Sequence, residues 1–230
     1  MALYAIADLH LSLGTDKPMD IFKGWRDYKD RLENNWRALI NEDDTVVIAG
    51  DISWAMKLEE CYEDFSFINS LPGTKILLKG NHDYWWATKK KIDEYLEANN
   101  FDSIKILFNN SFTVEDFTIC GSRGWYYDAD TEADIKVINR EVGRLKLSLD
   151  SAKESSKTPI VFLHYPPVYA QLECKEIMDT LIDYGIKECY YGHLHGSHTH
   201  KNAVIGNYKD VNMHLISCDF VDFMPVLVRN

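Results

Sequence analysis

Residues 45–51 read Thr-Val-Val-Ile-Ala-Gly-Asp. An unbroken apolar run that is rich in β-branched residues is typical of a strand buried on both faces of a parallel sheet. The pair Gly50-Asp51 follows the run at once. Ligands of α/β sheets bind beyond the carboxyl ends of the strands. The stretch therefore predicts an α/β fold with a functional carboxylate, Asp51, at the end of a buried strand.

Four further apolar runs share this design. Each reads as a buried strand and is followed at once by side chains that can bind metal. The runs are residues 3–7, 75–78, 160–163 and 188–191, and they lead into Asp8-Leu9-His10, Gly80-Asn81-His82-Asp83, His164 and Gly192-His193-Leu194-His195. We expect these strands to deliver their polar side chains to one edge of the sheet.

The spacing and the types of these side chains indicate a transition-metal site. Residues i and i+2 of an extended segment point to the same side, so Asp8 can act with His10, and His193 with His195. Imidazole and carboxylate without thiolate suit Mn, Fe, Zn or Ni better than Ca or a structural zinc–cysteine site. A single such residue near a strand end is usually a cap or a turn residue. If no metal site exists, that explanation must hold independently at every one of these positions, so we favour the metal site.

The rest of the chain alternates helical and strand patterns. Apolar residues recur at helical spacing within residues 25–39, 138–149 and 177–182, and further strands are expected at 104–108, 117–120, 214–218 and 226–228. The early alternation favours parallel crossovers, and the denser strands later favour a mixed or second sheet. A chain of 230 residues that is 46% hydrophobic can bury one sizeable core. Without a linker or a repeat, it predicts a single domain over residues 1–230.

Charge and cysteine content restrict the partners and the location. The formal net charge of −11 argues against a broad nucleic-acid footprint. No apolar run is long enough to span a bilayer, and no signal-peptide pattern stands at the start. The five cysteines include no Cys-x-x-Cys pair, which suits a reducing compartment. We expect a cytoplasmic protein without a membrane partner.

The five motifs, taken in order, resemble those of the calcineurin-like metallophosphoesterases. The family pattern is Asp-x-His, Gly-Asp, Gly-Asn-His-(Asp/Glu), His and Gly-His-x-His, and here it extends from residue 8 to residue 195. The resemblance implies a four-layer α/β (α+β) sandwich, in which two mixed β-sheets pack face to face with helices on the outside.

The resemblance also implies the roles of individual residues. One metal would be held by Asp8, His10, Asp51 and His195, and the other by Asp51, Asn81, His164 and His193. His82 would be the catalytic histidine, oriented by Asp83. Two divalent ions, most naturally Mn, about 3.5–4 Å apart would clamp the phosphate and hold a bridging hydroxide as the nucleophile. The implied activity is hydrolysis of a phosphate-ester substrate.

Departures from the family pattern narrow the subtype. Protein Ser/Thr phosphatases continue Gly-Asp with Asp-Arg, whereas Ile52 follows here, and purple acid phosphatases carry a tyrosine ligand where Trp54 stands. We therefore favour the small bacterial-type phosphodiesterase and phosphohydrolase branch. A phosphomonoesterase or protein phosphatase of the same fold is the alternative. A non-catalytic metal-binding scaffold is another, but the intact ligand set and His82 favour an enzyme.

Two further features have two interpretations each. Arg123 follows a strand between glycines and could bind the phosphate in bidentate fashion, but a surface ion pair explains it equally well. The aromatic residues near the motifs could stack on a base or sugar, although core packing is the more common role. These residues are Tyr84, Trp85, Trp86, Tyr126 and Tyr127.

Overall fold

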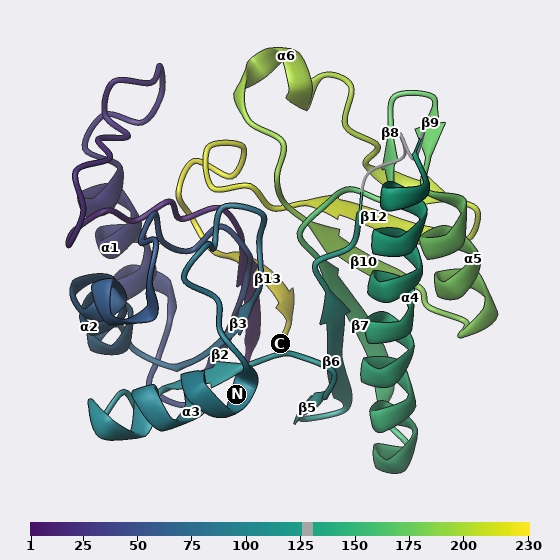
Figure 1. The fold of residues 1–230 in the computed structure, drawn as a ribbon, viewed down its shortest axis with the longest axis horizontal. Coiled ribbons are helices and arrows are strands. Elements are labelled where there is room, and N and C mark those ends of the chain that lie inside the picture. The colour runs from purple at the N-terminus through teal and green to yellow at the C-terminus, as the bar shows by residue number, and fades with distance from the viewer. Residues whose placement is uncertain (126–130) are drawn as a thin grey trace.

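The computed structural model describes residues 1–125 and 131–230, so Tyr126 and Tyr127 lie outside the described residues. Figure 1 shows two sheets facing each other, with helices on both outer sides. This succession of helices, sheet, sheet and helices confirms the predicted fold class. No described helix is long and apolar enough to cross a membrane.

The first sheet carries three of the five motif strands. Its order is β13 (Val226–Arg229), β1 (Leu3–Ile6), β2 (Thr45–Ala49), β3 (Thr74–Leu78) and β4 (Ile104–Ile106). Strands β1 to β4 run parallel, and β13 pairs antiparallel with β1 at the edge. The sheet is therefore mixed, as expected.

The second sheet carries the other two motif strands. Its order is β11 (Gly206–Tyr208), β12 (Val211–Leu215), β10 (Glu188–Tyr191), β7 (Thr158–Leu163), β6 (Phe117–Ser122) and β5 (Phe112–Val114). The central strands are parallel and both edges are antiparallel. A separate hairpin joins β8 (Val168–Tyr169) to β9 (Leu172–Glu173).

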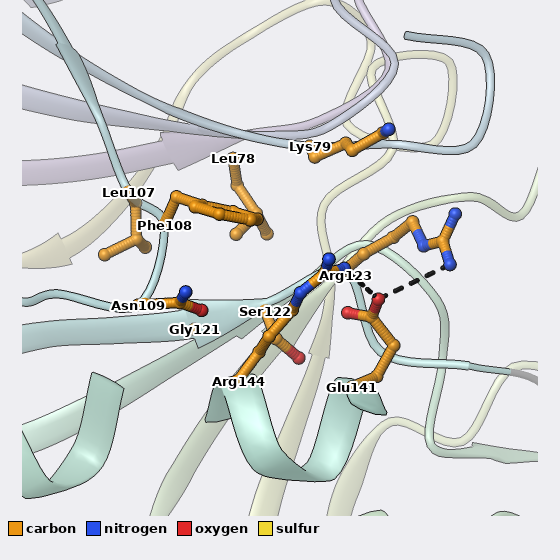
Figure 2. Close-up of a pocket in the computed structure, with 10 residues that line it drawn as sticks. All are labelled: Leu78, Lys79, Leu107, Phe108, Asn109, Gly121, Ser122, Arg123, Glu141 and Arg144. Carbon is orange, nitrogen blue, oxygen red and sulfur yellow. Dashed lines mark hydrogen bonds and ion pairs between the residues drawn. The ribbon is translucent and has the colours of Figure 1, made fainter. Parts of the chain in front are cut away.

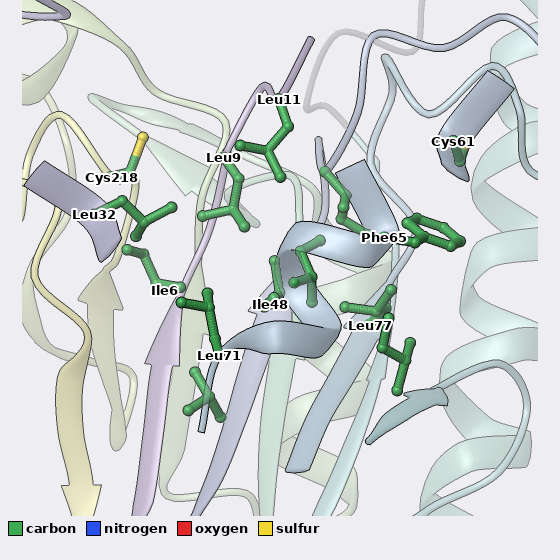
Figure 3. Packing of buried hydrophobic residues seen from close by; sticks show 14 of the residues in the cluster. Ile6, Leu9, Leu11, Leu32, Ile48, Cys61, Phe65, Leu71, Leu77 and Cys218 are labelled. Atoms are coloured by element: carbon green, nitrogen blue, oxygen red, sulfur yellow. The ribbon is translucent and has the colours of Figure 1, made fainter. Parts of the chain in front are cut away.

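The helices cover the outer faces of the two sheets. Against the first sheet lie α1 (Tyr28–Leu39), α2 (Tyr62–Ser70) and α3 (Lys89–Ala98), and against the second lie α4 (Glu132–Ala152) and α5 (Lys175–Asp183). Short helical turns occupy Leu58–Cys61, Lys153–Ser155 and α6 (Gly196–His200). Figure 3 shows Leu32 of α1 and Phe65 of α2 in the same buried cluster as Ile6, Ile48 and Leu77 of the sheet.

Burial on both faces explains the unbroken apolar runs. In β2, Val46 and Ile48 face the helices, whereas Val47 and Ala49 belong to the apolar layer between the two sheets. A strand that is buried on both faces gains nothing from alternating polar residues. All five cysteines are free and buried, and Cys120 and Cys189 act as small apolar residues, as their strand context indicates.

The strand expected at residues 214–218 is displaced toward the N-terminus. The second sheet contains Val211–Leu215 instead, and the chain then crosses to the first sheet. Ala7 N donates to Ile216 O at 2.9 Å, and Cys218 N donates to Ala7 O at 3.0 Å. This crossing connects the two sheets at their carboxyl ends and carries Asp219 to the end of β1.

Candidate metal centre

The polar residues that follow the five motif strands meet between the two sheets. The sequence prediction of one shared sheet edge is corrected here, because β1, β2 and β3 belong to the first sheet and β7 and β10 to the second. The carboxyl ends converge because the sheets face each other. His193 N donates to Asp8 Oδ2 at 2.8 Å, and His164 Nδ1 lies 3.2 Å from Ala49 O, so both contacts join the sheets.

The structure gathers the candidate ligands into two groups. Asp8, His10 and His195 form the first, and their ligand atoms all lie within 4.8 Å of one another. His10 Nε2 and His195 Nε2 are 3.2 Å apart, and Asp8 Oδ1 is 3.7 Å from His195 Nε2. Each group has the mixture of carboxylate and imidazole that suits a first-row divalent ion.

The second group contains Asp51, His164 and His193, again with ligand atoms within 4.8 Å of one another. His193 Nδ1 and Asn81 Oδ1 lie 3.2 Å and 2.6 Å from His164 Nε2. Asn81, which follows β3, therefore lies beside this group.

Asp51 stands between the two groups. Its Oδ2 atom lies 3.7 Å from His10 Nε2 and 3.5 Å from His164 Nε2. Its Oδ1 atom accepts a hydrogen bond from His82 N at 2.7 Å, which holds the carboxylate in place. One carboxylate thus faces ligands of both groups, which is the arrangement that a bridging ligand requires.

Unusual backbone conformations place these ligands. Asp8, His10, Asp51 and His193 all have positive φ, from 46° to 71°, immediately beyond their strands. Left-handed conformations are costly for residues other than glycine and concentrate at functional sites. They turn the chain sharply, so that side chains beyond the strand point into the gap between the sheets.

Two glycines permit the close approach of chain segments at the centre. A Cβ atom on Gly80 would overlap the Asp51 backbone and carboxylate, and one on Gly192 would lie 2.6 Å from Asp8 Oδ2. Neither segment could come so close with any other residue.

The donor set fits bound cations. Asp8 is fully buried, and its Oδ1 atom has no hydrogen-bond partner among the described residues. Burial raises the pKa of Asp8 to about 7, whereas it lowers the pKa of His164 to about 3 and of His193 to about 2. Neutral imidazoles are the form that binds metal, and a buried carboxylate oxygen without a partner requires a compensating charge.

Asp83 has a different partner from the one expected. It is buried, and its carboxylate accepts hydrogen bonds from Gly80 N at 2.7 Å, Ile52 N at 2.9 Å and Trp85 Nε1 at 3.0 Å. No hydrogen bond to the His82 ring occurs among the described residues. The expectation that Asp83 orients the ring is therefore corrected. It fixes the backbone of the two segments that follow β2 and β3, because its carboxylate bonds to Ile52 N of one and Gly80 N of the other.

The His82 ring lies at the rim of the centre. Its centroid is 4.5 Å from that of Trp54 and 5.7 Å from that of His10. Tyr84 is exposed, and its hydroxyl lies 3.4 Å from His82 Nδ1. Trp85 is 2% exposed and packs against Phe65, so core packing is confirmed for that member of the aromatic run.

Three residues at the centre were not identified from the sequence. Asp219 Oδ1 lies 2.9 Å from His195 Nδ1, and Asp219 Oδ2 accepts a hydrogen bond from Gly196 N at 2.8 Å. Burial disfavours the charged ring of His195, but Asp8 and Asp219 together raise its pKa to about 9. Trp54 stacks on His10 with ring centroids 5.0 Å apart, and Trp25 contacts the same ring edge-on at 5.7 Å. The sequence does contain a signal for Asp219, because this residue directly follows the apolar strand-like run at residues 214–218.

Arg123 lies next to the centre but is paired elsewhere. Its backbone carbonyl accepts hydrogen bonds from His164 N at 3.2 Å and Tyr165 N at 2.9 Å. Figure 2 shows its guanidinium directed to Glu141, at 3.5 Å, and Arg144 contacts the same carboxylate. Glu141 is 0% exposed, and Arg123 is only 17% exposed. The contacts favour the ion-pair interpretation, with the pair partly buried.

Comparison with known proteins agrees with this geometry. The sequence profile of the calcineurin-like phosphoesterases matches residues 1–197. The chain belongs to the calcineurin-like phosphoesterase family. It is accordingly a hydrolase that acts on phosphoester bonds, in a family that depends on metal.

Solved structures with the same fold come from distant relatives. A protein of unknown function from Aquifex aeolicus is 18% identical, with a TM-score of 0.53, over 98% of this chain and 94% of that chain. The phosphopantetheinyl hydrolase of Mycobacterium tuberculosis is 16% identical, with a TM-score of 0.56, over 94% of this chain and 88% of that chain. At these identities the likeness shows the fold alone. A search among curated proteins found no match.

Proposed function

We propose that this member of the calcineurin-like phosphoesterase family hydrolyses a phosphate ester at a centre that holds two divalent ions. Asp8, His10 and His195 would hold one ion, Asn81, His164 and His193 the other, and Asp51 both. The observation that carries the proposal is the position of Asp51 Oδ2, 3.7 Å from His10 Nε2 and 3.5 Å from His164 Nε2. Two ions so held, most naturally Mn, would polarise the phosphate and lower the pKa of the attacking water.

The protein's own groups would position the substrate and move the protons. The P–O bond to the leaving alcohol breaks as a P–O bond to the oxygen of water forms, and the attacking water releases one proton to solvent while the leaving oxygen gains one. His82 supplies the proton that the leaving oxygen needs, because its ring stands at the rim and is not part of either ligand group. Asp219 holds the His195 ring through its Nδ1 side, so that Nε2 faces the centre.

The ligand geometry supports an enzyme over a binding scaffold. All the motif residues lie within the two groups or beside them, and the Asp51 carboxylate between the groups faces a histidine of each. A solved protein of this fold is itself named a hydrolase. We place the chain in the small phosphodiesterase and phosphohydrolase branch, as Trp54 and Ile52 favour, with a phosphomonoesterase as the alternative.

The experiment that tests the proposal is metal analysis of purified protein combined with hydrolysis of paired nitrophenyl monoesters and diesters in Mn²⁺. The wild type is expected to bind two ions and to cleave one ester type preferentially. Asp51→Asn is expected to hold at most one ion tightly and to lose activity by a factor of about 10² or more, because several kcal/mol of transition-state stabilisation depend on the ions. Asp43→Asn, on the exposed turn before β2, is the matched control.

Two tightly bound ions in Asp51→Asn would refute the bridging role. A wild type that binds two ions but cleaves neither ester type with Mn, Fe, Zn or Ni would favour the scaffold.

A further inference from the structure

A cavity of about 420 Å³ opens beside the metal centre. His10, His82 and His195 form its inner end, and Phe22, Trp25 and Trp54 form much of its wall. The segment that contributes Phe22 and Trp25 lies between β1 and α1. The cavity therefore borders the reacting groups on one side and an aromatic surface on the other.

The aromatic wall is preorganised. Trp25 is 3% exposed and packs edge-on against Phe223, with ring centroids 5.2 Å apart. Trp54 stacks on His10, and its indole Nε1 lies 3.3 Å from Met19 Sδ, another lining atom. Rings that are already fixed lose little entropy when a ligand packs on them.

The mouth of the cavity exposes apolar surface. The Phe22 side chain is 53% exposed, although it lines the cavity. Covering such surface is favourable in proportion to the apolar area removed from water. Among the described lining residues, Lys23 is the one lysine or arginine. The lining suits an apolar group better than a second phosphate.

The position of His82 decides which part of a substrate would enter the cavity. His82 lines it, and under the proposed function this residue protonates the leaving oxygen. The alcohol bonded to that oxygen must then extend from His82 into the cavity. We propose that the cavity binds the leaving alcohol of the substrate, and that this alcohol carries an apolar group. The inference rests on the proposed function and specifies the class of substrate for it.

The test is a series of n-alkyl esters from ethyl to hexyl, used below their micelle concentrations. They are phosphate monoesters, or methyl alkyl phosphate diesters if the enzyme requires a diester, in which case release of the n-alkanol and not of methanol is measured. The alkanols differ little in acidity, so the intrinsic reactivity stays nearly constant along the series. Full burial of each added methylene would raise kcat/KM about fourfold. With partial burial, we expect the hexyl ester to exceed the ethyl ester by about tenfold or more.

Two neighbouring variants place the effect in the cavity. Phe22→Ala is expected to lower the hexyl-to-ethyl ratio of kcat/KM by about threefold or more, because it removes part of the apolar wall. Ile21→Ala is the matched control, since Ile21 is 74% exposed and does not line the cavity. Both positions are accessible enough that neither change opens a hole in the core, and circular dichroism checks that both variants are folded.

The outcomes separate this inference from the proposed function. No turnover of any ester, including the nitrophenyl esters, would overturn the proposed function itself. Turnover of the ethyl ester with an equal kcat/KM for the hexyl ester would overturn only the inference about the cavity. Equal loss of chain-length preference in Phe22→Ala and Ile21→Ala would overturn it as well, because the preference would then arise outside the cavity.

Discussion

The cavity beside His82 and the pocket beside Arg123 lie near the same strand ends and differ in almost every property. The first has a volume of about 420 Å³, whereas the second has about 10 Å³, which is room for roughly one water molecule. The first is walled by aromatic rings. The second is filled by Arg123, Arg144 and the buried Glu141 that pairs with both (Figure 2).

The difference shows why residue type alone is a weak guide to substrate contact. An arginine is the natural partner of a phosphate, but the Arg123 guanidinium already balances a carboxylate that is 0% exposed. The open space beside the metal centre is on the His82 side. We therefore propose that the substrate binds in the aromatic cavity and that Arg123 and Arg144 have a structural role beside Glu141.

The largest effect is expected at His82. His82→Asn should keep both metal ions and lower kcat on an alkyl ester by about 10²–10⁴-fold, the usual contribution of general acid catalysis. The loss should be smaller on a nitrophenyl ester of the same type, because nitrophenolate departs without a proton. Steady-state kinetics on both esters, with metal analysis, measures this.

His198→Asn, at an exposed position on α6, is the control for a lost imidazole. If chemistry limits turnover and the two esters lose equal activity, His82 is a positioning group. It then does not protonate the leaving alcohol. Loss of metal would make it a ligand.

A smaller effect is expected at Asp219, which also lines the aromatic cavity. Asp219→Asn should weaken binding of one metal ion by about 10–100-fold, as is typical when the carboxylate behind a histidine ligand is replaced. Activity should recover substantially at high Mn²⁺ concentration. Metal titration followed by calorimetry gives the affinity.

Asp222→Asn is a close control, because Asp222 is exposed and pairs with Arg31 instead of a motif histidine. Unchanged affinity for both ions in Asp219→Asn would show that the contact with His195 is not needed to hold the metal, and would leave Asp219 as part of the cavity wall.

The smallest effect on activity is expected at Arg123. Arg123→Ala should change kcat/KM by less than about threefold but destabilise the fold by about 1–3 kcal/mol, because buried Glu141 keeps only one partner. Thermal unfolding and steady-state kinetics separate these effects. Arg140→Ala, at an exposed position of the same helix as Glu141, should change neither.

A rise in KM of tenfold or more without destabilisation would contradict the structural role of Arg123 and make it a phosphate ligand. Glu141→Gln sharpens the test, since it removes the buried charge that Arg123 is proposed to balance. In the Glu141→Gln background, Arg123→Ala should cost less stability than in the wild type.

Local sequence was a good guide to the strands and a poor guide to contacts between neighbouring residues. The strand at Thr45–Ala49 has the predicted bounds, because a short apolar run rich in β-branched residues suits a strand that is buried on both faces. The family resemblance implies that Asp83, the next residue in the chain, orients His82. Adjacent side chains in a tight turn point in different directions, so Asp83 binds Gly80 N and Ile52 N instead.

The sequence by itself determined the family, the strands and the residues that end them, because apolar runs and metal-binding side chains are local features of the chain. Only the tertiary structure decided that the ligands come from two facing sheets and that Asp219 stands behind His195. It also decided that the open space lies beside Trp25 and Trp54. These features depend on how segments far apart in the chain pack together, and no local pattern specifies that packing.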